Sequence, residues 1–165
     1  MKTYLDKNVY EAALERIAYC FQEFDNVLVA FSGGKDSGVM LNLCYDYANE
    51  HGLLDKLTMY HLDYEAQYQM TTEYVTRTFL EQFPGIRKMW YCVPIKAQSA
   101  CALGEPYWTP WDAAKKKLWV RAMPENPYVV HEGNLDVPFR HGMVDYEFQD
   151  KLSRHFAKKR GTTAV

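Results

Sequence analysis

Six consecutive residues combine the side chains and the backbone that phosphate binding needs. They are Ser32, Gly33, Gly34, Lys35, Asp36 and Ser37. Adjacent glycines let the main chain approach an anion closely, because no Cβ intervenes. The hydroxyls are donors, Lys35 is a cation, and Asp36 has a carboxylate that could hold a magnesium ion or orient a donor. The chemistry that this set suits is the binding of a pyrophosphate group.

The segments on either side predict that this loop lies at a helix N-terminus. Residues 27–31 form an apolar run without alternation, which is typical of a central parallel strand covered on both faces. Residues 38–44 predict a helix that continues to about Glu50 and stops at Gly52. Such a turn points several backbone N–H groups at one place, where the helix dipole favours negative charge. We therefore expect the bend to hold a diphosphate.

The hexamer differs from the Walker A loop, which has four residues between its first glycine and the Gly-Lys pair. Residues 32–37 resemble, residue for residue, the Ser-Gly-Gly-Lys-Asp-Ser motif of the adenine-nucleotide alpha-hydrolase-like proteins. That superfamily includes the N-type ATP pyrophosphatases and the phosphoadenosine phosphosulfate reductases. The alternative is a glycine-rich turn that only tightens packing, but such a turn has no use for Lys35, Asp36 and two serines.

The resemblance implies a nucleotide, a metal ion and a fold. ATP or phosphoadenosine phosphosulfate would bind through residues 32–37, and Asp36 would hold Mg²⁺. The implied fold is HUP-like, a Rossmann-like three-layer sandwich. If the chain is a catalyst, the implied reaction is cleavage of ATP between its α and β phosphates, which activates an acceptor as its adenylate.

The rest of the chain predicts the same fold class, an α/β protein with an open parallel sheet and helices on both faces. A spacing of three and four between apolar residues predicts an amphipathic helix over 10–24. Strands are predicted at 57–62 and 88–93, with a helix over about 70–83 between them. Strands that alternate with helices imply right-handed crossovers and parallel pairing.

The pattern changes after Pro94. Residues 95–143 form an irregular, aromatic-rich region in which only 128–131 could be a short strand. A helix is predicted over 145–160, with Asp145 as its N-cap, and 162–165 have β propensity. We expect one adenine-nucleotide-binding domain over residues 1–165.

Composition sets limits on partners and compartment. The net charge is −2, which gives no overall attraction to nucleic acid. Neither a transmembrane stretch nor a signal-peptide apolar region is present, so we expect a cytoplasmic protein without membrane contact. The four cysteines lack the C-x-x-C spacing of zinc sites, and we expect them to be reduced. They are Cys20, Cys44, Cys92 and Cys101. No histidine is assigned a catalytic role.

Asp63 is a second candidate for the nucleotide site. In an open α/β sheet, ligands bind outside the carboxyl ends of the strands, and Asp63 follows the strand at 57–62. Its carboxylate could accept from a ribose or an adenine amine, or bind the same metal as Asp36. The alternative is an exposed turn aspartate. The resembling families also have an aspartate here, but they follow it with Thr-Gly rather than Tyr64-Glu65.

Residues 106–112 and 118–124 resemble a phage- and plasmid-associated branch of the phosphoadenosine phosphosulfate reductase-like proteins. The tryptophans of this region are predicted to fill a second small core, or else to form a contact surface. They are Trp108, Trp111 and Trp119. Arg121 could contact an anion or form a salt bridge. The basic residues at 115–117 and in 151–160 are predicted to be solvated, so a nucleic-acid partner is not favoured.

The resembling reductases attack sulfate with a cysteine in a C-terminal tail, whereas the last cysteine here is Cys101. Relatives also place an arginine-rich element after a strand that corresponds to 162–165. We therefore assign no catalytic residue, and we expect a nucleotide-dependent transferase or hydrolase rather than a reductase. A protein partner could supply the missing elements. The alternative is an inactive, shortened member that acts by protein–protein interaction, such as a phage-encoded regulator or inhibitor.

Overall fold

The computed structural model describes residues 6–99 and 103–165, so Cys101 lies outside the described residues. Five parallel strands form one sheet in the order β6-β3-β2-β1-β7. Their bounds are β1 Asn26–Ala30, β2 Leu57–Leu62, β3 Arg87–Cys92, β6 Val129–His131 and β7 Thr163–Ala164. The predicted strands are therefore confirmed to within one or two residues, including the short ones at the two edges.

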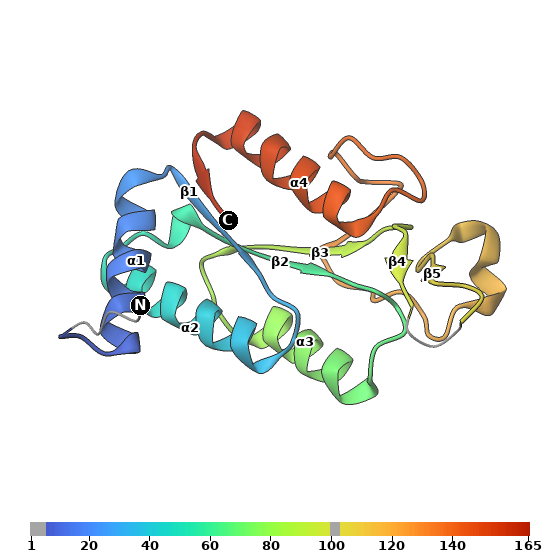
Figure 1. Cartoon of the computed structure of the whole chain (residues 1–165), viewed down its shortest axis with the longest axis horizontal. Helices are drawn as coiled ribbons and strands as arrows, with labels where there is room; N and C mark the ends of the chain where they lie inside the picture. The colour runs from blue at the N-terminus through green and yellow to red at the C-terminus, as the bar shows by residue number, and fades with distance from the viewer. Residues whose placement is uncertain (1–5, 100–102) are drawn as a thin grey trace.

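Helices cover both faces of this sheet (Figure 1). α1 (Val9–Glu23), α2 (Lys35–Glu50) and α3 (Gln69–Glu81) lie on one face, and α4 (Asp145–Arg160) lies on the other. The result is the predicted α/β three-layer sandwich of Rossmann-like form. The predicted N-cap of α4 is wrong, because the N-cap is Val144 and Asp145 is the first helical residue. Its carboxylate still lies in the first turn, where it complements the helix dipole.

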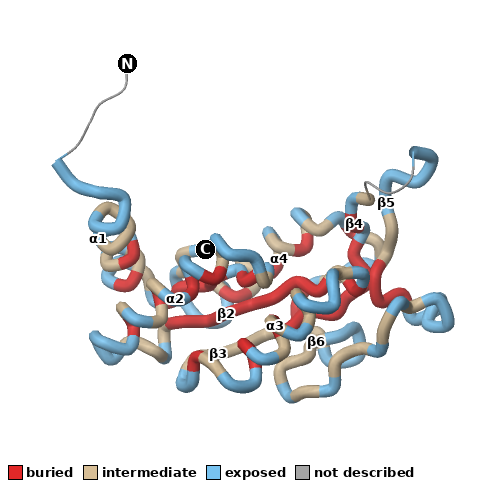
Figure 2. The backbone as a smooth tube through the Cα atoms, turned by 90° about the horizontal axis from the view of Figure 1, so that it is seen from below, coloured by how far each residue is buried: buried red, intermediate tan, exposed pale blue. Residues whose placement is uncertain are grey.

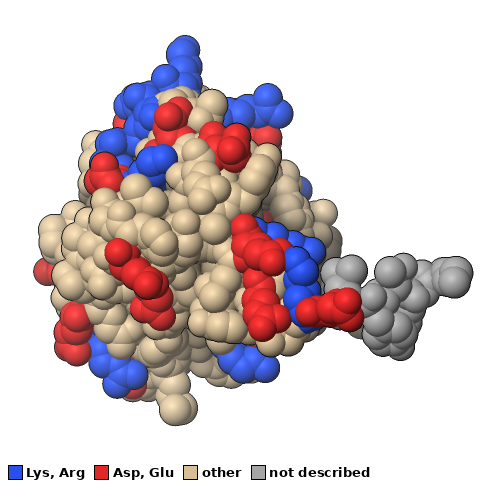
Figure 3. Space-filling model, turned by 90° about the vertical axis from the view of Figure 1, so that its left-hand side faces the viewer, with Lys and Arg blue, Asp and Glu red and all other residues tan. Residues whose placement is uncertain are grey.

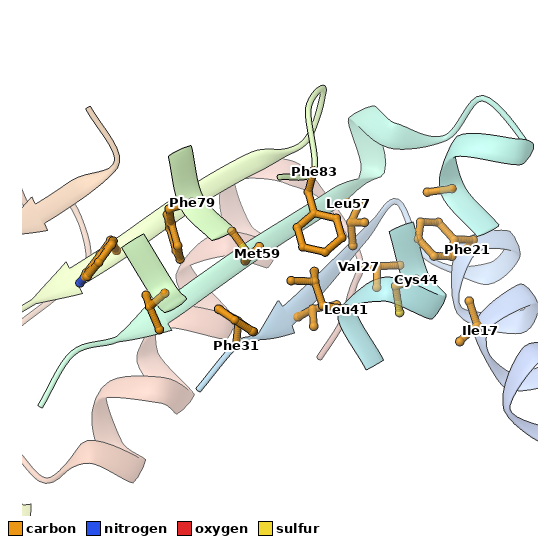
Figure 4. Packing of buried hydrophobic residues seen from close by; sticks show 14 of the residues in the cluster. Ile17, Phe21, Val27, Phe31, Leu41, Cys44, Leu57, Met59, Phe79 and Phe83 are labelled. Atoms are coloured by element: carbon orange, nitrogen blue, oxygen red, sulfur yellow. The ribbon is translucent and has the colours of Figure 1, made fainter. Parts of the chain in front are cut away.

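Each face of the sheet has its own apolar core. Phe21, Leu41 and Phe79 pack on the side of α1, α2 and α3 (Figure 4), while Phe148 and Leu152 of α4 pack on the other. β2 lies between the two cores and is buried along its whole length (Figure 2). This double cover explains why the central strands are apolar without alternation.

The region 95–143 is irregular, as predicted, apart from short elements. β4 (Ala97–Gln98) and β5 (Tyr107–Trp108) pair antiparallel, and a 3-10 helix, η2, spans Ala113–Leu118. A second 3-10 helix, η1 (Leu54–Lys56), precedes β2. Within the described ranges, no helix has the length and apolarity that crossing a lipid bilayer requires.

Candidate phosphate-binding loop

The 32–37 loop joins the carboxyl end of β1 to the first turn of α2. The helix begins at Lys35, three residues earlier than the sequence predicts, with Gly34 as its N-cap. Lys35, Asp36 and Ser37 are thus the first helical residues, and no side chain caps them. The N–H groups of a first helical turn have no partner inside the helix. The loop therefore presents donors as well as side chains.

The loop satisfies some of its own donors. The backbone N–H of Ser32 donates to Ser37 Oγ, and that of Gly34 donates to Ser32 Oγ, each at 3.2 Å. The two serine hydroxyls share a hydrogen bond of 2.9 Å. The other N–H groups of the loop meet no acceptor within the described part of the chain. They belong to Gly33, Lys35, Asp36 and Ser37.

The charges of the loop are open to solvent. The side chains of Lys35 and Asp36 are 88% and 97% exposed, and Lys35 Nζ lies 3.8 Å from Asp36 Oδ1. At such exposure this ion pair contributes little and does not fix either group. Both side chains can turn toward a ligand.

Gly33 fixes the backbone of the loop against α3. Its φ is +83°, and a Cβ here would lie 2.8 Å from Val75 Cγ2 and 3.0 Å from Thr71 Cγ2. A side chain would be strained in this conformation and would also collide with α3. The close approach therefore requires glycine.

His61 supports the strand that leads into the loop. Its Nδ1–H donates to the carbonyl of Phe31 at 2.7 Å. Burial lowers the pKa of His61, so the ring is neutral at pH 7 and this tautomer fits the carbonyl acceptor. His61 holds the end of β1 in place.

Asp63 lies at the carboxyl end of β2, next to β1, where the sequence places it. It is, however, fully buried, and its carboxylate accepts from Arg121, Trp90 and Glu65, with the Cys92 thiol a further donor at 3.9 Å. Arg121 Nη2 donates to the two carboxylate oxygens of Asp63 at 2.6 and 2.7 Å. Trp90 Nε1 and the backbone N–H of Glu65 also donate to this carboxylate, each at 2.7 Å. The prediction that Asp63 meets the nucleotide or its metal is therefore corrected, because its oxygens are occupied. The exposed-turn alternative is wrong as well.

Glu65 is a second buried carboxylate, which sequence reasoning did not single out. It is 3% exposed and accepts from the backbone N–H groups of Trp111 and Val120, both at 2.8 Å. Its φ is +65°. An acidic residue in a polar turn is ordinarily solvated, so the sequence carried no signal for this role. Asp63, Glu65, Trp111 and Arg121 together are called the anchor cluster here.

The anchor cluster attaches the aromatic region to the sheet. Trp111 is 2% exposed and donates from Nε1 to the carbonyl of Asp63 at 2.8 Å. Arg121 lies over the Trp111 ring at 4.9 Å, and Trp119 packs edge-on against Trp111 at 5.2 Å. For Arg121 the salt-bridge alternative is confirmed. Trp111 and Trp119 pack in a core, but the second small core expected for them is wrong, because both belong to the core on the side of α1, α2 and α3. Trp108 lies in β5 and is half-buried.

Two cavities adjoin the loop. One, of about 490 Å³, runs along β1 and is lined by Ala30, Ser37 and Met40 among others. The other, of about 620 Å³, is lined by Tyr68, Thr71 and Val120. Since Thr71 contacts the backbone at Gly33, this second cavity also borders the loop. Both could receive part of a ligand whose phosphates lie on the loop.

Within the described ranges, no group of three or more His, Cys, Asp or Glu is placed to hold a metal. Asp36 could still supply one ligand, since Mg²⁺ typically binds one or two carboxylates together with phosphates and water. Cys44 and Cys92 are buried free thiols. Burial raises the pKa of Cys44 to about 11 and raises that of Cys92 as well. Neither is therefore a thiolate at neutral pH.

The basic side chains of α4 are largely paired with neighbours. Lys151 lies 3.0 Å from Glu147, and Arg154 lies 2.9 Å from Asp150, each one helical turn away. Residues 115–117 are exposed. Paired or exposed charges of this kind are solvated, as the sequence predicts for these residues. That nucleic acid is not a partner stays a prediction.

No model of a protein family matches this chain. The chain is 30% identical over 158 residues to "Uncharacterized protein YbdN" of Escherichia coli (strain K12). The match covers 94% of this chain but 37% of that relative, so the chain spans little more than a third of the relative's length. The name of that relative states no activity.

Proposed function

We propose that this chain binds ATP or a related adenine nucleotide, such as phosphoadenosine phosphosulfate, with the phosphates on the 32–37 loop. The proposal places the chain in the phosphoadenosine phosphosulfate reductase and N-type ATP pyrophosphatase superfamily, in its phage- and plasmid-associated branch. One observation carries it: four backbone N–H groups that meet no acceptor among the described residues lie at the exposed start of α2, beside Lys35.

The physical argument is one of charge and donors. α2 has 16 residues, and the positive end of its dipole coincides with the four N–H groups and the ammonium of Lys35. Asp36 would repel an anion by itself, but it would bind the Mg²⁺ that accompanies a nucleotide. When bound, that ion would offset the charge of the phosphates.

Cleavage of the nucleotide between its α and β phosphates requires more than binding. A phosphoryl transition state needs cations aimed at its oxygens. Arg121 is committed to Asp63, which leaves Lys35 as the cation of the loop itself. We therefore propose that binding is a property of this chain, and that any cleavage needs further polypeptide, either a longer chain or a protein partner.

Isothermal titration tests this proposal. Mg²⁺ with ATP, and separately phosphoadenosine phosphosulfate, are titrated into the wild-type chain and into Lys35→Ala and Asp36→Ala. We expect the dissociation constant to rise at least about tenfold in Lys35→Ala, because a charge-assisted contact of about 1.5–3 kcal/mol is lost. Lys117→Ala, an exposed lysine outside the loop, is the matched control and should bind normally. A folded sample that gives no heat with either nucleotide would contradict the proposal.

A second candidate function rests on exposed apolar side chains beside the same loop. Tyr68, Leu118 and Val120 are 87%, 76% and 66% exposed and line adjoining cavities at the carboxyl end of the sheet. Exposed apolar groups that gather in one place favour protein contact. The chain would then be an inactive family member that acts as a regulator or inhibitor. Absence of nucleotide binding in the titration above supports this candidate over the first.

A further inference from the structure

A small basic cavity lies at the opposite end of the sheet, between the start of β3 and the carboxyl half of α4. Its volume is about 150 Å³. Its charged lining residues are Arg87, Asp136, His155, Lys159 and Arg160, and they are called the basic pocket here. Arg87 is the first residue of β3, whereas the 32–37 loop follows the last residue of β1. Because these strands are parallel, the two places lie at opposite edges of the sheet.

The charges of the basic pocket do not balance. Asp136 is its single carboxylate, and it is paired with Lys159 at 2.7 Å. Lys159, through this hydrogen bond, holds the pKa of Asp136 below its usual range. In residues 6–99 and 103–165, no carboxylate lies within ion-pair distance of Arg87 or Arg160. The pocket therefore has two guanidinium groups without a counter-charge.

Arg87 is the less solvated of the two. It is half-buried, and its Nη1 reaches Thr58 Oγ1 only at 3.4 Å. Burial, and then the charge of Arg160, lower the pKa of Arg87, which means that the guanidinium is less well compensated than in water. A half-buried cation beside a like charge gains from an anion that offsets both charges.

His155 lies beside the same carboxylate. Its Nε2 atom is buried, lies 3.7 Å from Asp136 Oδ2, and forms no hydrogen bond with any residue that the structure describes. On the surface, Lys and Arg side chains gather, with some carboxylates among them, at the top of the face drawn in Figure 3, where α4 ends in Figure 1.

We propose that the basic pocket is a second anion site, which binds a tetrahedral oxyanion between Arg87 and Arg160. Guanidinium groups match phosphate and sulfate oxygens in pairs of hydrogen bonds. The pocket has room for such an ion but not for a nucleotide. The anion joins the start of β3 to the end of α4 and so stabilises the folded chain. The site is independent of the 32–37 loop.

Calorimetric titration with inorganic phosphate, sulfate and glycerol 2-phosphate tests this site. Each is compared with sodium chloride at equal ionic strength, and thermal unfolding is followed in parallel. We expect phosphate and sulfate to bind and to raise the unfolding temperature, and Arg87→Gln to weaken phosphate binding at least tenfold. Binding of glycerol 2-phosphate as well would mark the site as one for phosphate monoesters, while rejection of it would mark a site for free oxyanions.

Three further variants keep the test decisive. Arg160→Gln, at an exposed position, should also weaken phosphate binding if Arg87→Gln fails to fold. Asp136→Asn should tighten binding several-fold, because it removes the one negative charge and frees Lys159. Lys35→Ala should change nothing at this site. Stabilisation no greater than that by chloride, weaker binding in Asp136→Asn, or loss of binding in Lys35→Ala alone would each overturn the proposal.

Discussion

The carboxyl ends of β1 and β2 are neighbours in the sheet, and polar residues follow both strands, yet the two ends are built differently. After β1, the charges of Lys35 and Asp36 are exposed, and four N–H groups meet no acceptor among the residues that the structure describes. After β2, Asp63 and Glu65 are buried, and their carboxylates accept from distant residues of the chain as well as from within the turn. One end is open to a ligand and the other is closed.

The difference shows that a carboxylate at a strand end is not by itself a binding site. A buried carboxylate must be paired, because an unpaired buried charge costs several kcal/mol. At β2 the pairing comes from the chain itself, through a segment that begins 46 residues after Glu65. At β1 the side chains of Lys35 and Asp36 stay exposed among the described residues. What decides the outcome is the covering segment rather than the residue type.

The largest expected effect on stability comes from breaking the contact between Arg121 and Asp63 at the closed end, after β2. Arg121→Ala leaves Asp63 buried without its cation, and we expect the free energy of unfolding to fall by about 3–5 kcal/mol. Urea denaturation measures it. Arg154→Ala, which removes an exposed ion pair on α4, is the control and should cost about 0.5 kcal/mol or less. Equal costs for the two variants would show that the anchor cluster does not hold the fold together.

A change inside the open end can also act on stability, but only through the backbone. Gly33→Ala forces a Cβ toward Val75 and Thr71 at a φ of +83°, and we expect a loss of about 2 kcal/mol. Gly34→Ala is the control, since its φ of −84° suits alanine and the one close atom is a serine hydroxyl. If Gly34→Ala lowered the free energy of unfolding more than Gly33→Ala in urea denaturation, the close packing of Gly33 on α3 would be contradicted.

The rate of cysteine labelling measures how often the closed end, after β2, opens to solvent. Cys92 Sγ lies 3.9 Å from Asp63 Oδ2, and burial followed by the charge of Asp63 raises the pKa of its thiol. In a Cys20→Ser, Cys101→Ser background, we expect slow labelling of Cys92 by a disulfide reagent at pH 8. Arg121→Lys loses the contact with both oxygens of Asp63 and should speed this labelling about tenfold. A tenfold rise corresponds to a decrease of about 1.4 kcal/mol in the free energy of local opening around Cys92.

Cys44 is the internal control for that experiment, because it is buried in α2 and packs in the core on the other side of β1 from α4. Its labelling rate should stay the same in Arg121→Lys. Acceleration at both cysteines would indicate global destabilisation rather than opening of the anchor cluster.

The smallest expected effect on stability is at the charges of the open end. Lys35→Ala should change the free energy of unfolding by no more than about 0.5 kcal/mol, since the side chain is 88% exposed. Its effect is on ligand binding instead. A loss of stability comparable to that of Arg121→Ala would remove the contrast between the two strand ends.

The fold was predictable from the sequence to within a few residues because its signals are local. Apolar runs and periodic spacing within ten or fifteen residues define β1, β2, α1 and α3, and Gly161 marks the end of α4. The start of α2 was missed by three residues, since glycines and a serine conceal a first helical turn that already includes Lys35. The predicted position of the 32–37 loop, between β1 and α2, is nevertheless correct.

The anchor cluster was not predictable in the same way, because its contacts join distant positions. Arg121 pairs with Asp63 across 58 residues, and Val120 meets Glu65 across 55. The sequence could offer Arg121 only as an anion contact or a salt bridge. A positive φ at Glu65 also carries no sequence signal, because glycine and asparagine are the residues expected there.

The most direct test of the open end is to observe its backbone N–H groups during ligand binding. In a ¹⁵N-labelled chain, titration with ATP and Mg²⁺ should shift the amide signals of Gly33, Lys35, Asp36 and Ser37 more than any others, to saturation. Lys35→Ala should weaken the response without changing which amides respond. Signals that stay in place at these four positions, in a folded sample at millimolar nucleotide, would contradict a phosphate site at the end of β1.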